Sequence, residues 1–308
     1  MTTREPLSVV ILTKDEAANL PECLDALLPQ LEGDDEVIVV DSASRDATVQ
    51  IAEARGVRVK AYPTNVSFGA ARNAGIEMAR HDVIAFVSAD AVPEPGWIDA
   101  LRRAVRNADI VYGRQRHAPP TDNAATVSRG LRYHHFEVQS EGLPERYASN
   151  VNAAYRRLAF DTLHFDENAL GAEDVAFAKE ARFAGLRIAY APDALVRHKD
   201  VASWKSEWRK HQREGAAHAQ LHKLLGAPRG HLAWAVAVGG MGLIFAVSGN
   251  LFVLGGTVLV FFAPTLRRLM SPVARRYKPH ALALGALASP LFDLAFVTSY
   301  VKRRIVHV

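Results

Sequence analysis

The sequence predicts an α/β fold with a mostly parallel central sheet, followed by an α-helical region that associates with a membrane. Short, β-branched apolar runs alternate with helix-like segments over roughly the first two-thirds of the 308 residues. Within most of these runs the apolar residues are continuous, which is typical of parallel strands that helices cover on both faces. The last third has a different composition, because residues 232–266 include no charged side chain.

The predicted elements alternate in a regular order. Strands are expected at Ser8–Leu12, Glu36–Val40, Val57–Ala61, Val83–Val87, Asp109–Gly113 and Arg187–Ala191. Helices are expected at Ala18–Leu31, Ala47–Arg55, Gly69–Arg80, Pro95–Asn107 and Ala172–Ala184. This pattern breaks down between residues 114 and 150. We therefore expect three regions: a catalytic domain over residues 1–203, an amphipathic linker helix over 204–230 and membrane-embedded helices over 231–308.

Charge and cysteine content narrow the function classes. The formal net charge is +4 at pH 7, and no Lys- and Arg-rich tract with interleaved aromatic residues occurs, so we expect no nucleic-acid partner. The single Cys23 cannot form an internal disulfide, which indicates a reducing compartment. The first ten residues lack the pattern of a signal peptide, so the catalytic domain is expected on the cytoplasmic side of a cell membrane.

Polar residues follow the first four predicted strands. Thr13, Asp15 and Glu16 come after the first strand, and Asp41 comes directly after the second. Ligands of open parallel sheets bind outside the carboxyl ends of the strands, so these side chains are expected at one binding edge. Carboxylates there suit a nucleotide sugar. One can accept a hydrogen bond from the ribose or base, and another can hold Mg²⁺ or Mn²⁺ against the pyrophosphate.

Five sequence segments occur in an order and at a spacing that resemble a known family. They are SVVILTKDEAANL, EVIVVDSASRDAT, GAARNAG, SADAVP and GAEDVAFAKEARFAG. Over about residues 7–198 the chain resembles the inverting family 2 glycosyltransferases of the GT-A fold. The resemblance implies a GT-A-type nucleotide-sugar-binding domain, a nucleoside diphosphate sugar as donor and a divalent metal, Mg²⁺ or Mn²⁺, as cofactor.

The resemblance also implies roles for individual residues. The donor-side positions are Thr13, Asp15, Glu16, Asp41, Arg72, Asn73, Ala89 and Arg114. Asn150 and Asn152 resemble donor- or acceptor-side positions. Asp90 matches the metal-binding Asp of the DxD-type motif, and His198 is expected near the metal or diphosphate. The first position of that motif is Ser88, and SADAVP resembles the single-Asp form of rhamnosyltransferase-like members.

Glu173 and Asp174 begin a predicted helix after Gly171. By resemblance Asp174 is the general base, with Glu173 beside it in the catalytic pair. The reaction requires a base because an acceptor hydroxyl must lose its proton as it attacks the anomeric carbon, and a positioned carboxylate typically contributes ~10²–10⁴-fold. Alone, two acidic residues in a first helical turn are better explained by the helix dipole, and it is the upstream motifs that favour the catalytic role.

The C-terminal third is predicted to enter the membrane. The uncharged run 232–266 is interrupted near its middle by Ser248, Gly249 and Asn250, which favours a tight helical hairpin. A third apolar run, His280–Tyr300, contains Pro290 and Asp293. Basic residues flank the apolar runs, as an anionic cytoplasmic leaflet favours. The alternative for these runs is a hydrophobic dimerisation module, which would make the chain a homo-oligomer.

The leading hypothesis is transfer of a single sugar to a hydroxyl or phosphate of a membrane-associated acceptor, such as a lipid-linked glycan or glycolipid. The Gln-x-x-Arg-Trp signature of processive members is missing, which favours single addition. One alternative is a non-catalytic, membrane-bound nucleotide-sugar-binding subunit, for which Ser88 is the main support. Another is a nucleotidyltransferase, although ILTKDEAANL has no glycine and carries acidic residues where that class needs a Gly-rich basic loop.

Overall fold

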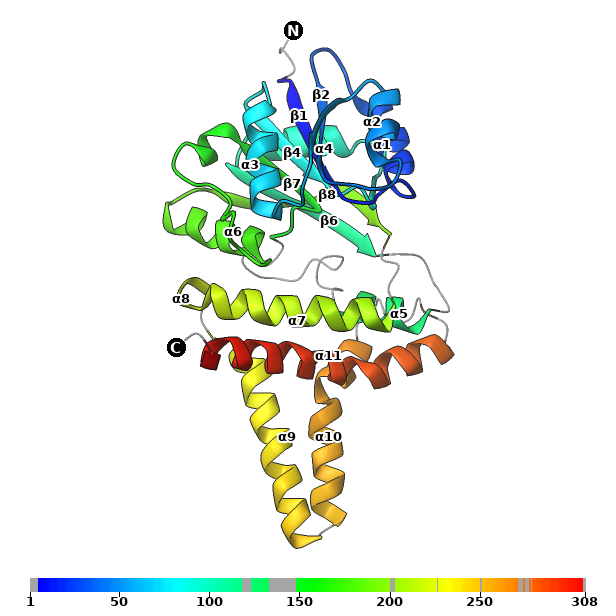
Figure 1. Ribbon diagram of the computed structural model, residues 1–308, viewed down its shortest axis with the longest axis vertical. Coiled ribbons are helices and arrows are strands. Elements are labelled where there is room, and N and C mark those ends of the chain that lie inside the picture. Colours follow the sequence, from blue (N-terminus) through cyan, green and yellow to red (C-terminus); the bar gives the residue numbers. More distant parts are fainter. Residues whose placement is uncertain are drawn as a thin grey trace. The chain divides into compact units, whose positions relative to one another are not determined.

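The computed structural model describes residues 5–117, 123–132, 148–199, 203–225, 227–249, 251–270, 274, 277 and 279–306. Two compact units are present in this part of the chain. The first contains all the strands together with α1 to α4 and α6, and the second contains α5 and α7 to α11 (Figure 1).

The first unit is built on an eight-stranded mixed sheet in the order β3-β2-β1-β4-β7-β6-β8-β5. Its strands are β1 (Leu7–Thr13), β2 (Glu36–Ser42), β3 (Arg58–Tyr62), β4 (Val83–Val87), β5 (Ala91–Pro93), β6 (Ile110–His117), β7 (Asn152–Arg156) and β8 (Ile188–His198). Strands β1 to β4 pair in parallel, as do β6 and β8, whereas β7 and β5 run antiparallel to their neighbours. The predicted α/β fold with a mostly parallel sheet is confirmed.

Helices cover both faces of this sheet, as the continuous apolar runs predict. They are α1 (Leu20–Leu27), α2 (Thr48–Ala54), α3 (Phe68–Met78), α4 (Trp97–Val105) and α6 (Glu173–Phe183). Successive side chains of a strand point to opposite faces. Val9 and Ile11 of β1 therefore lie in the cluster under α1 and α4, and Val10 lies in the cluster under α3 and α6. Burial of each such side chain contributes about 1.5–3 kcal/mol.

Strand β7 gives the sheet its antiparallel part. It pairs with β4 from Val83↔Arg156 to Val87↔Asn152 and with β6 through Ile110↔Tyr155. Its first residue therefore lies at the same edge of the sheet as the last residue of β4. The sequence pattern did not predict this strand, because NAAYR is short and alanine-rich and follows a stretch without periodicity.

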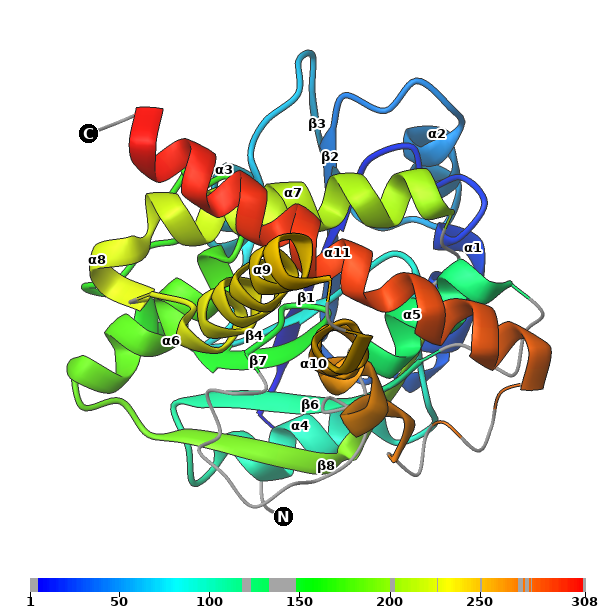
Figure 2. The same ribbon diagram turned by 90° about the horizontal axis from the view of Figure 1, so that it is seen from below.

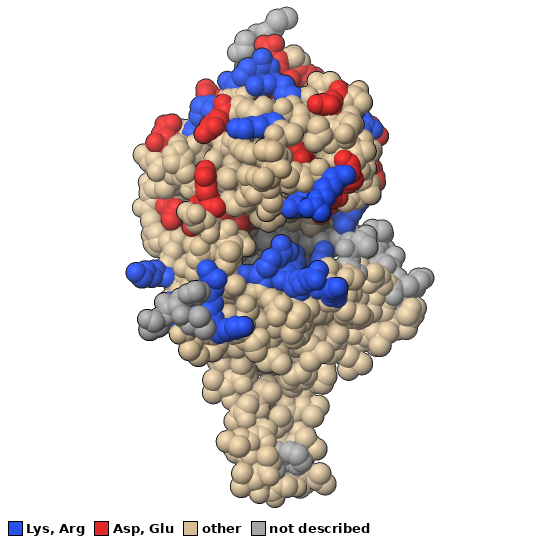
Figure 3. Space-filling model, in the orientation of Figure 1, with Lys and Arg blue, Asp and Glu red and all other residues tan. Residues whose placement is uncertain are grey.

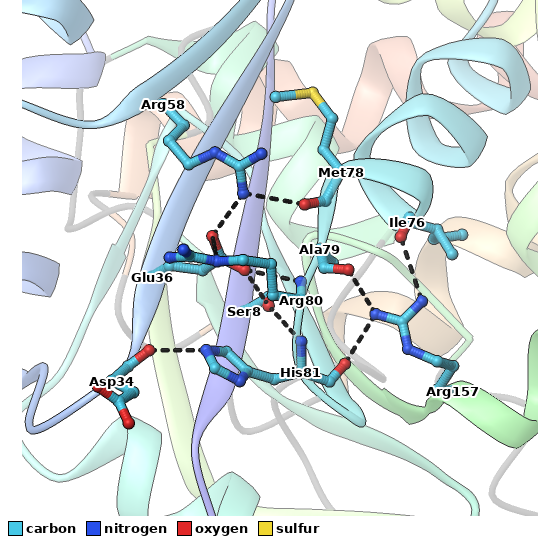
Figure 4. A network of polar contacts seen from close by, with 10 residues as sticks. All are labelled: Ser8, Asp34, Glu36, Arg58, Ile76, Met78, Ala79, Arg80, His81 and Arg157. Carbon is cyan, nitrogen blue, oxygen red and sulfur yellow. Dashed lines mark hydrogen bonds and ion pairs between the residues drawn. The ribbon is translucent and has the colours of Figure 1, made fainter.

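At the amino edge of the sheet, buried Glu36 is surrounded by donors (Figure 4). Its carboxylate accepts hydrogen bonds from Ser8 Oγ (2.8 Å), the Arg80 amide (2.8 Å), Arg80 Nε (3.1 Å) and Arg58 Nη1 (2.6 Å). Burial alone would raise the pKa of Glu36, but these hydrogen bonds outweigh it, and the pKa lies below its usual value. At the same edge, the Arg157 guanidinium donates hydrogen bonds to carbonyls at the end of α3 and in the segment before β4, and so links these two elements.

The second unit is helical. It contains α5 (Ala124–Arg132), α7 (Trp204–Gln220), α8 (His222–Leu225), α9 (Arg229–Ser248), α10 (Leu251–Leu269) and α11 (Pro279–Val306). Three of them, α9, α10 and α11, are long and apolar enough to cross a membrane. Helices α9 and α10 are joined at Gly249, whose φ of 63° suits a residue without a side chain. The predicted helical hairpin is therefore present.

Candidate active site at the carboxyl edge of the sheet

Thr13 and Asp41 end the neighbouring strands β1 and β2, and the sheet register places them opposite each other. Thr13 Oγ1 donates to Asp41 Oδ1 at 2.8 Å. The other carboxylate oxygen of Asp41 accepts from the Ser44 amide at 2.8 Å. Both residues are buried, so Asp41 is held in one orientation at the end of the sheet.

The loops after β1 and β2 hold each other in place. The Asp15 amide donates to Ser44 Oγ (2.8 Å), and Asp15 Oδ1 accepts from the Arg45 amide (2.7 Å). Asp15 and Ala43 adopt left-handed φ angles of 55° and 58°. Among the described residues, Ala172 is the third non-glycine residue with such an angle, and it directly precedes Glu173. Strained backbone of this kind persists only where surrounding structure enforces it, and it clusters at functional sites.

Asp90 and His198 lie side by side, with Asp90 Oδ1 3.3 Å from His198 Nε2. The antiparallel pairing of β5 with β8 sets this position, because it places Ala91 opposite His198. Ala89 is buried directly before Asp90. Glu16 is close enough to interact electrostatically with both side chains. Burial raises the pKa of Glu16, and the Asp90 charge raises it further.

Asp174 occupies the first turn of α6 in a partly buried setting. Its carboxylate accepts from the Val175 amide at 2.8 Å and, more weakly, from the Asn150 amide at 3.4 Å. Arg72, from α3, forms an ion pair with the buried Glu173. Burial and the neighbouring Glu173 charge raise the pKa of Asp174 to about 6. The site thus contains a carboxylate whose pKa lies close to neutral pH.

Two buried tyrosines lie next to Asn150 and Asp174. Tyr155 of β7 donates from its hydroxyl to Asn150 Oδ1 at 2.6 Å, and its ring packs edge-on against Tyr112 of β6. Both tyrosines interact electrostatically with Asp174. The side-chain nitrogen of Asn150 is buried and has no hydrogen-bond partner among the described residues. Sequence reasoning did not identify either tyrosine, because a buried aromatic residue in a strand is usually explained by packing.

Three other predicted residues lie in more internal settings. Asn73 binds the backbone of Phe165 through both ends of its amide, at 3.0 and 3.1 Å, so it fastens the loop after β7 to α3. Asn152 is fully buried, accepts from Trp97 Nε1 and donates to the carbonyls of Arg114 and Ala194. We infer that Asn152 joins strands inside the sheet. The partly buried Arg114 has no partner for its Nε among the described residues.

The donor set at Asp90 and His198 suits a divalent cation. A carboxylate oxygen and an imidazole nitrogen are both ligands of Mn²⁺, and carboxylates are the usual protein ligands of Mg²⁺. No group of three His, Cys, Asp or Glu side chains that could hold a metal ion occurs within the described ranges. A cation held here would therefore need further ligands from a bound diphosphate or from water, as is common for Mg²⁺.

Comparison with known proteins identifies the family. The family model described as "Glycosyl transferase family 2" matches residues 8–163, which include β1 to β4, the Asp41 and Asp90 loops and β7. The chain belongs to glycosyl transferase family 2. The resemblance seen in the five sequence segments is thus confirmed, and the protein is a glycosyltransferase.

Relatives of this glycosyltransferase include enzymes of polysaccharide synthesis. It is 28% identical over 229 residues to the O-antigen chain rhamnosyltransferase RfbN of Salmonella typhimurium, which covers 69% of this chain and 72% of that protein. It is 28% identical to the O-antigen chain rhamnosyltransferase WbaN of Salmonella anatum, over 64% of this chain and 67% of the relative.

Solved structures share the GT-A fold with this glycosyltransferase. The mannosyltransferase PcManGT from Pyrobaculum calidifontis, in complex with GDP-Man and Mn²⁺, has a TM-score of 0.58 at 19% identity, covering 97% of this chain and 88% of that one. Glucosyl-3-phosphoglycerate synthase from Mycobacterium tuberculosis, with Mn²⁺, UDP-Glc and phosphoglyceric acid, has a TM-score of 0.54 at 21% identity, covering 73% of this chain and 81% of that one. Members of this fold therefore bind Mn²⁺ together with a nucleotide sugar.

Proposed function

We propose that this glycosyltransferase moves a single hexose or deoxyhexose from a nucleoside diphosphate sugar, with inversion, to a hydroxyl or phosphate of a lipid-linked or other membrane-associated glycan. The observation that carries the proposal is the carboxylate of Asp174. It lies at the carboxyl edge of the sheet, is held by two backbone amides and has a pKa raised to about 6. Such a group can accept a proton at neutral pH.

The nucleotide occupies the end of β1 and β2 in this proposal. Thr13 holds Asp41 in a fixed orientation, so the Asp41 carboxylate can accept from the base or ribose. The loops that carry Asp15 and Glu16 are tied to the loop after β2, which preorganises them. Preorganised partners reduce the entropy lost when the donor binds.

Proton transfer falls to Asp174. The acceptor hydroxyl loses its proton to the ionised Asp174 as its oxygen forms a bond to the anomeric carbon, and the bond from that carbon to the diphosphate oxygen breaks. Arg72 holds Glu173 in an ion pair, so Asp174 is the carboxylate of the two that is available to accept the proton. Asn73 and Asn150 act by positioning α3 and the loop before β7 around this carboxylate.

Asp90 and His198 would hold the divalent cation, Mg²⁺ or Mn²⁺. The cation supplies Lewis-acid stabilisation of the charge that develops on the leaving diphosphate. Ser88 removes one carboxylate from the motif, and the adjacent His198 offers an imidazole nitrogen as a second ligand beside Asp90. Metal binding weaker than at a two-carboxylate motif is expected.

The acceptor and sugar class follow from the apolar helices and the relatives. Three helices long and apolar enough to span a bilayer support attachment of the enzyme to a membrane, with the catalytic domain on the cytoplasmic side. Two relatives are named O-antigen chain rhamnosyltransferases, which favours a deoxyhexose donor. A lipid-linked glycan acceptor fits both observations.

The proposal is tested with the full-length protein in native membranes. Nucleoside diphosphate sugars are supplied singly with Mg²⁺, Mn²⁺ or a chelator, and free nucleotide release and label in the lipid-extractable fraction are measured. We expect one donor to give metal-dependent release together with labelled lipid. Donor binding without release across the whole panel and with native lipid acceptors would instead favour the non-catalytic binding subunit.

A further inference from the structure

The hairpin formed by α9 and α10 presents an uncharged apolar surface. Trp234 Nε1 donates to the Val260 carbonyl at 3.0 Å, so the two helices pack along each other. Their outward side chains are largely exposed, with Val247 at 83% and Phe252 at 92%. The face of the hairpin seen in Figure 3 shows neither basic nor acidic side chains. Exposed apolar surface of this extent indicates contact with lipid or another apolar phase.

The two hairpin helices have the length of a bilayer. Helix α9 has 20 residues and α10 has 19. At ~1.5 Å per residue they extend about 30 Å and 28 Å, against a hydrocarbon core of ~30 Å. Divided at Ser248–Asn250, the uncharged run 232–266 alone gives two halves of about 16 residues each, which are short for full spans. In the structure each helix extends beyond that run at the open end of the hairpin, so both can cross.

Helix α11 differs from the hairpin although its mean hydropathy is at least as high as that of α9 and α10. It runs beside α7 and across the open end of the hairpin (Figures 1 and 2). Aromatic contacts fix it to α7: Phe292 stacks on His211 with centroids 5.3 Å apart, and Phe296 packs on His218 at 5.3 Å. Over half of its most apolar window is buried within the protein, against none for α9.

Charged side chains join the middle of α11 to the open end of the hairpin, where α9 begins and α10 ends. Asp293 is 1% exposed and lies 3.1 and 3.2 Å from the guanidinium nitrogens of Arg268, near the end of α10. His231, near the start of α9, lies 3.5 Å from Asp293. Because the hairpin meets α11 at its centre, α11 cannot lie parallel to α9 and α10 as a third neighbouring span.

The outer face of α11 is itself apolar. Its exposed large apolar side chains are spaced by three, four or seven residues and form one stripe, in which Thr298 lies within the longest interval: Leu284, Leu287, Leu291, Leu294, Val301 and Ile305. The opposite face carries Phe292, Asp293 and Phe296, which pack against α7 and the hairpin. A helix buried on one face and apolar on the other suits the boundary between protein and lipid.

We propose that α9 and α10 cross the bilayer, and that α11 lies in the plane of the cytoplasmic leaflet with its leucine stripe in the lipid. Basic residues gather at the open end of the hairpin and at the end of α11, namely Arg229, Arg267, Arg268, Lys302, Arg303 and Arg304. They complement the anionic headgroups of that leaflet. Two crossings, in place of three, put the C-terminus and the catalytic unit on the same side. This inference rests on the membrane attachment in the proposed function and on none of its chemistry.

Cysteine accessibility tests the crossings in the full chain. Cys23 is buried and burial raises its pKa to about 12, so the unaltered protein is a labelling blank. We expect Ser248→Cys, at the hairpin turn, to react with an impermeant maleimide in intact cells. Lys302→Cys, near the end of α11, should react only after permeabilisation. Labelling of Lys302→Cys in intact cells, or protection of Ser248→Cys from both sides, overturns the proposal.

Depth measurements test the orientation of α11. Spin labels at Leu284→Cys, Leu291→Cys and Ile305→Cys lie on one face of the helix and cover most of its length. In anionic vesicles an in-plane helix places all three at the same depth, judged by collisions with oxygen against a polar nickel complex. A deep label at Leu291→Cys with shallow labels at both ends shows a spanning helix and contradicts the proposal. Neither measurement uses sugar transfer, so failure here leaves the proposed reaction untouched.

Discussion

The carboxylates at the two edges of the sheet have pKa values shifted in opposite directions. At the amino edge, Glu36 is surrounded by Ser8, Arg58 and Arg80, and its pKa is lowered. At the carboxyl edge, Asp174 and Glu16 have raised pKa values. At the amino edge the charge of Glu36 is therefore compensated by its neighbours, and these contacts stabilise the fold. The carboxyl edge keeps negative charge that its own residues do not fully compensate, which is the state expected of a site that binds a cation and moves a proton.

Apart from loss of the base itself, the largest effect is expected at the proposed metal site. Asp90→Ala should lower transfer by about 10²–10³-fold, because the leaving diphosphate loses its cation. Asp193→Ala, an exposed change on the same strand as His198, is the matched control and should keep transfer near the unaltered rate. Rates are compared over a Mn²⁺ titration. Equal transfer by Asp90→Ala and the control at every metal concentration would remove Asp90 from the site.

A substitution at the amino edge should lower the stability of the protein and leave the transfer rate of the folded protein unchanged. Glu36→Gln removes a buried charge that compensates two arginines, and we expect a loss of about 1–3 kcal/mol in the free energy of unfolding at pH 7. The pKa of Glu36 is lower in the folded protein, so its stabilisation is present at neutral pH and is lost as the pH falls through the folded pKa. Denaturant titrations at several pH values measure this difference. Loss of turnover in the folded fraction would show that the two edges are coupled.

The pH dependence of transfer should sharpen the contrast. Asp174 must be ionised to accept a proton, so transfer should fall about tenfold per pH unit below its pKa of about 6. Glu173→Gln removes the neighbouring charge that raises this pKa, while Arg72 remains, so the acidic limb should move to lower pH. A pH-rate profile of the two proteins gives the shift. If the acidic limb lies at the same pH in both proteins, ionisation of Asp174 does not determine the acidic limb of the profile.

The smallest effect expected is a gain in stability at the carboxyl edge. The pKa of Asp174 is raised on folding, so its ionised form costs folding energy above about pH 6 and costs little at low pH. Asp174→Asn should therefore be more stable than the unaltered protein by on the order of 1 kcal/mol at pH 8, and by less at pH 5. Unfolding at both pH values measures this. A loss at pH 8 would show that the carboxylate supports the fold.

Local pattern predicted the parallel half of the sheet well. Continuous apolar runs mark β1, β2 and β4, and the positions of Asp41 and Asp90 follow from where β2 and β4 end. Strand β7 and the environment of Asp174 were beyond local pattern. They depend on antiparallel pairing between segments far apart in the chain, which brings Asn150 and Tyr155 under α6. The same pairing buries Asn152, so its resemblance to a site position gave no sign of its internal hydrogen bonds.

Residues 114–150 illustrate a second limit of sequence patterns. Their mixed polar composition gave no periodic signal, yet Ala124–Arg132 forms helix α5 of the second unit. Arg129 of α5 forms an ion pair with the buried Glu207 of α7. A contact between an insertion in one domain and a helix beyond that domain leaves no mark in local periodicity. The equal hydropathy of α9 and α11 likewise hides the difference in what each packs against.

The central claim is that Asp174 is the base of a sugar transfer at the carboxyl edge. The most direct measurement compares Asp174→Asn with Glu180→Gln, an exposed change on the same helix, for both donor binding and transfer at pH 8. We predict that both variants bind the donor as the unaltered protein does. Glu180→Gln should transfer normally and Asp174→Asn should be slower by about 10²–10⁴-fold. Transfer by Asp174→Asn at the rate of its control would contradict the claim.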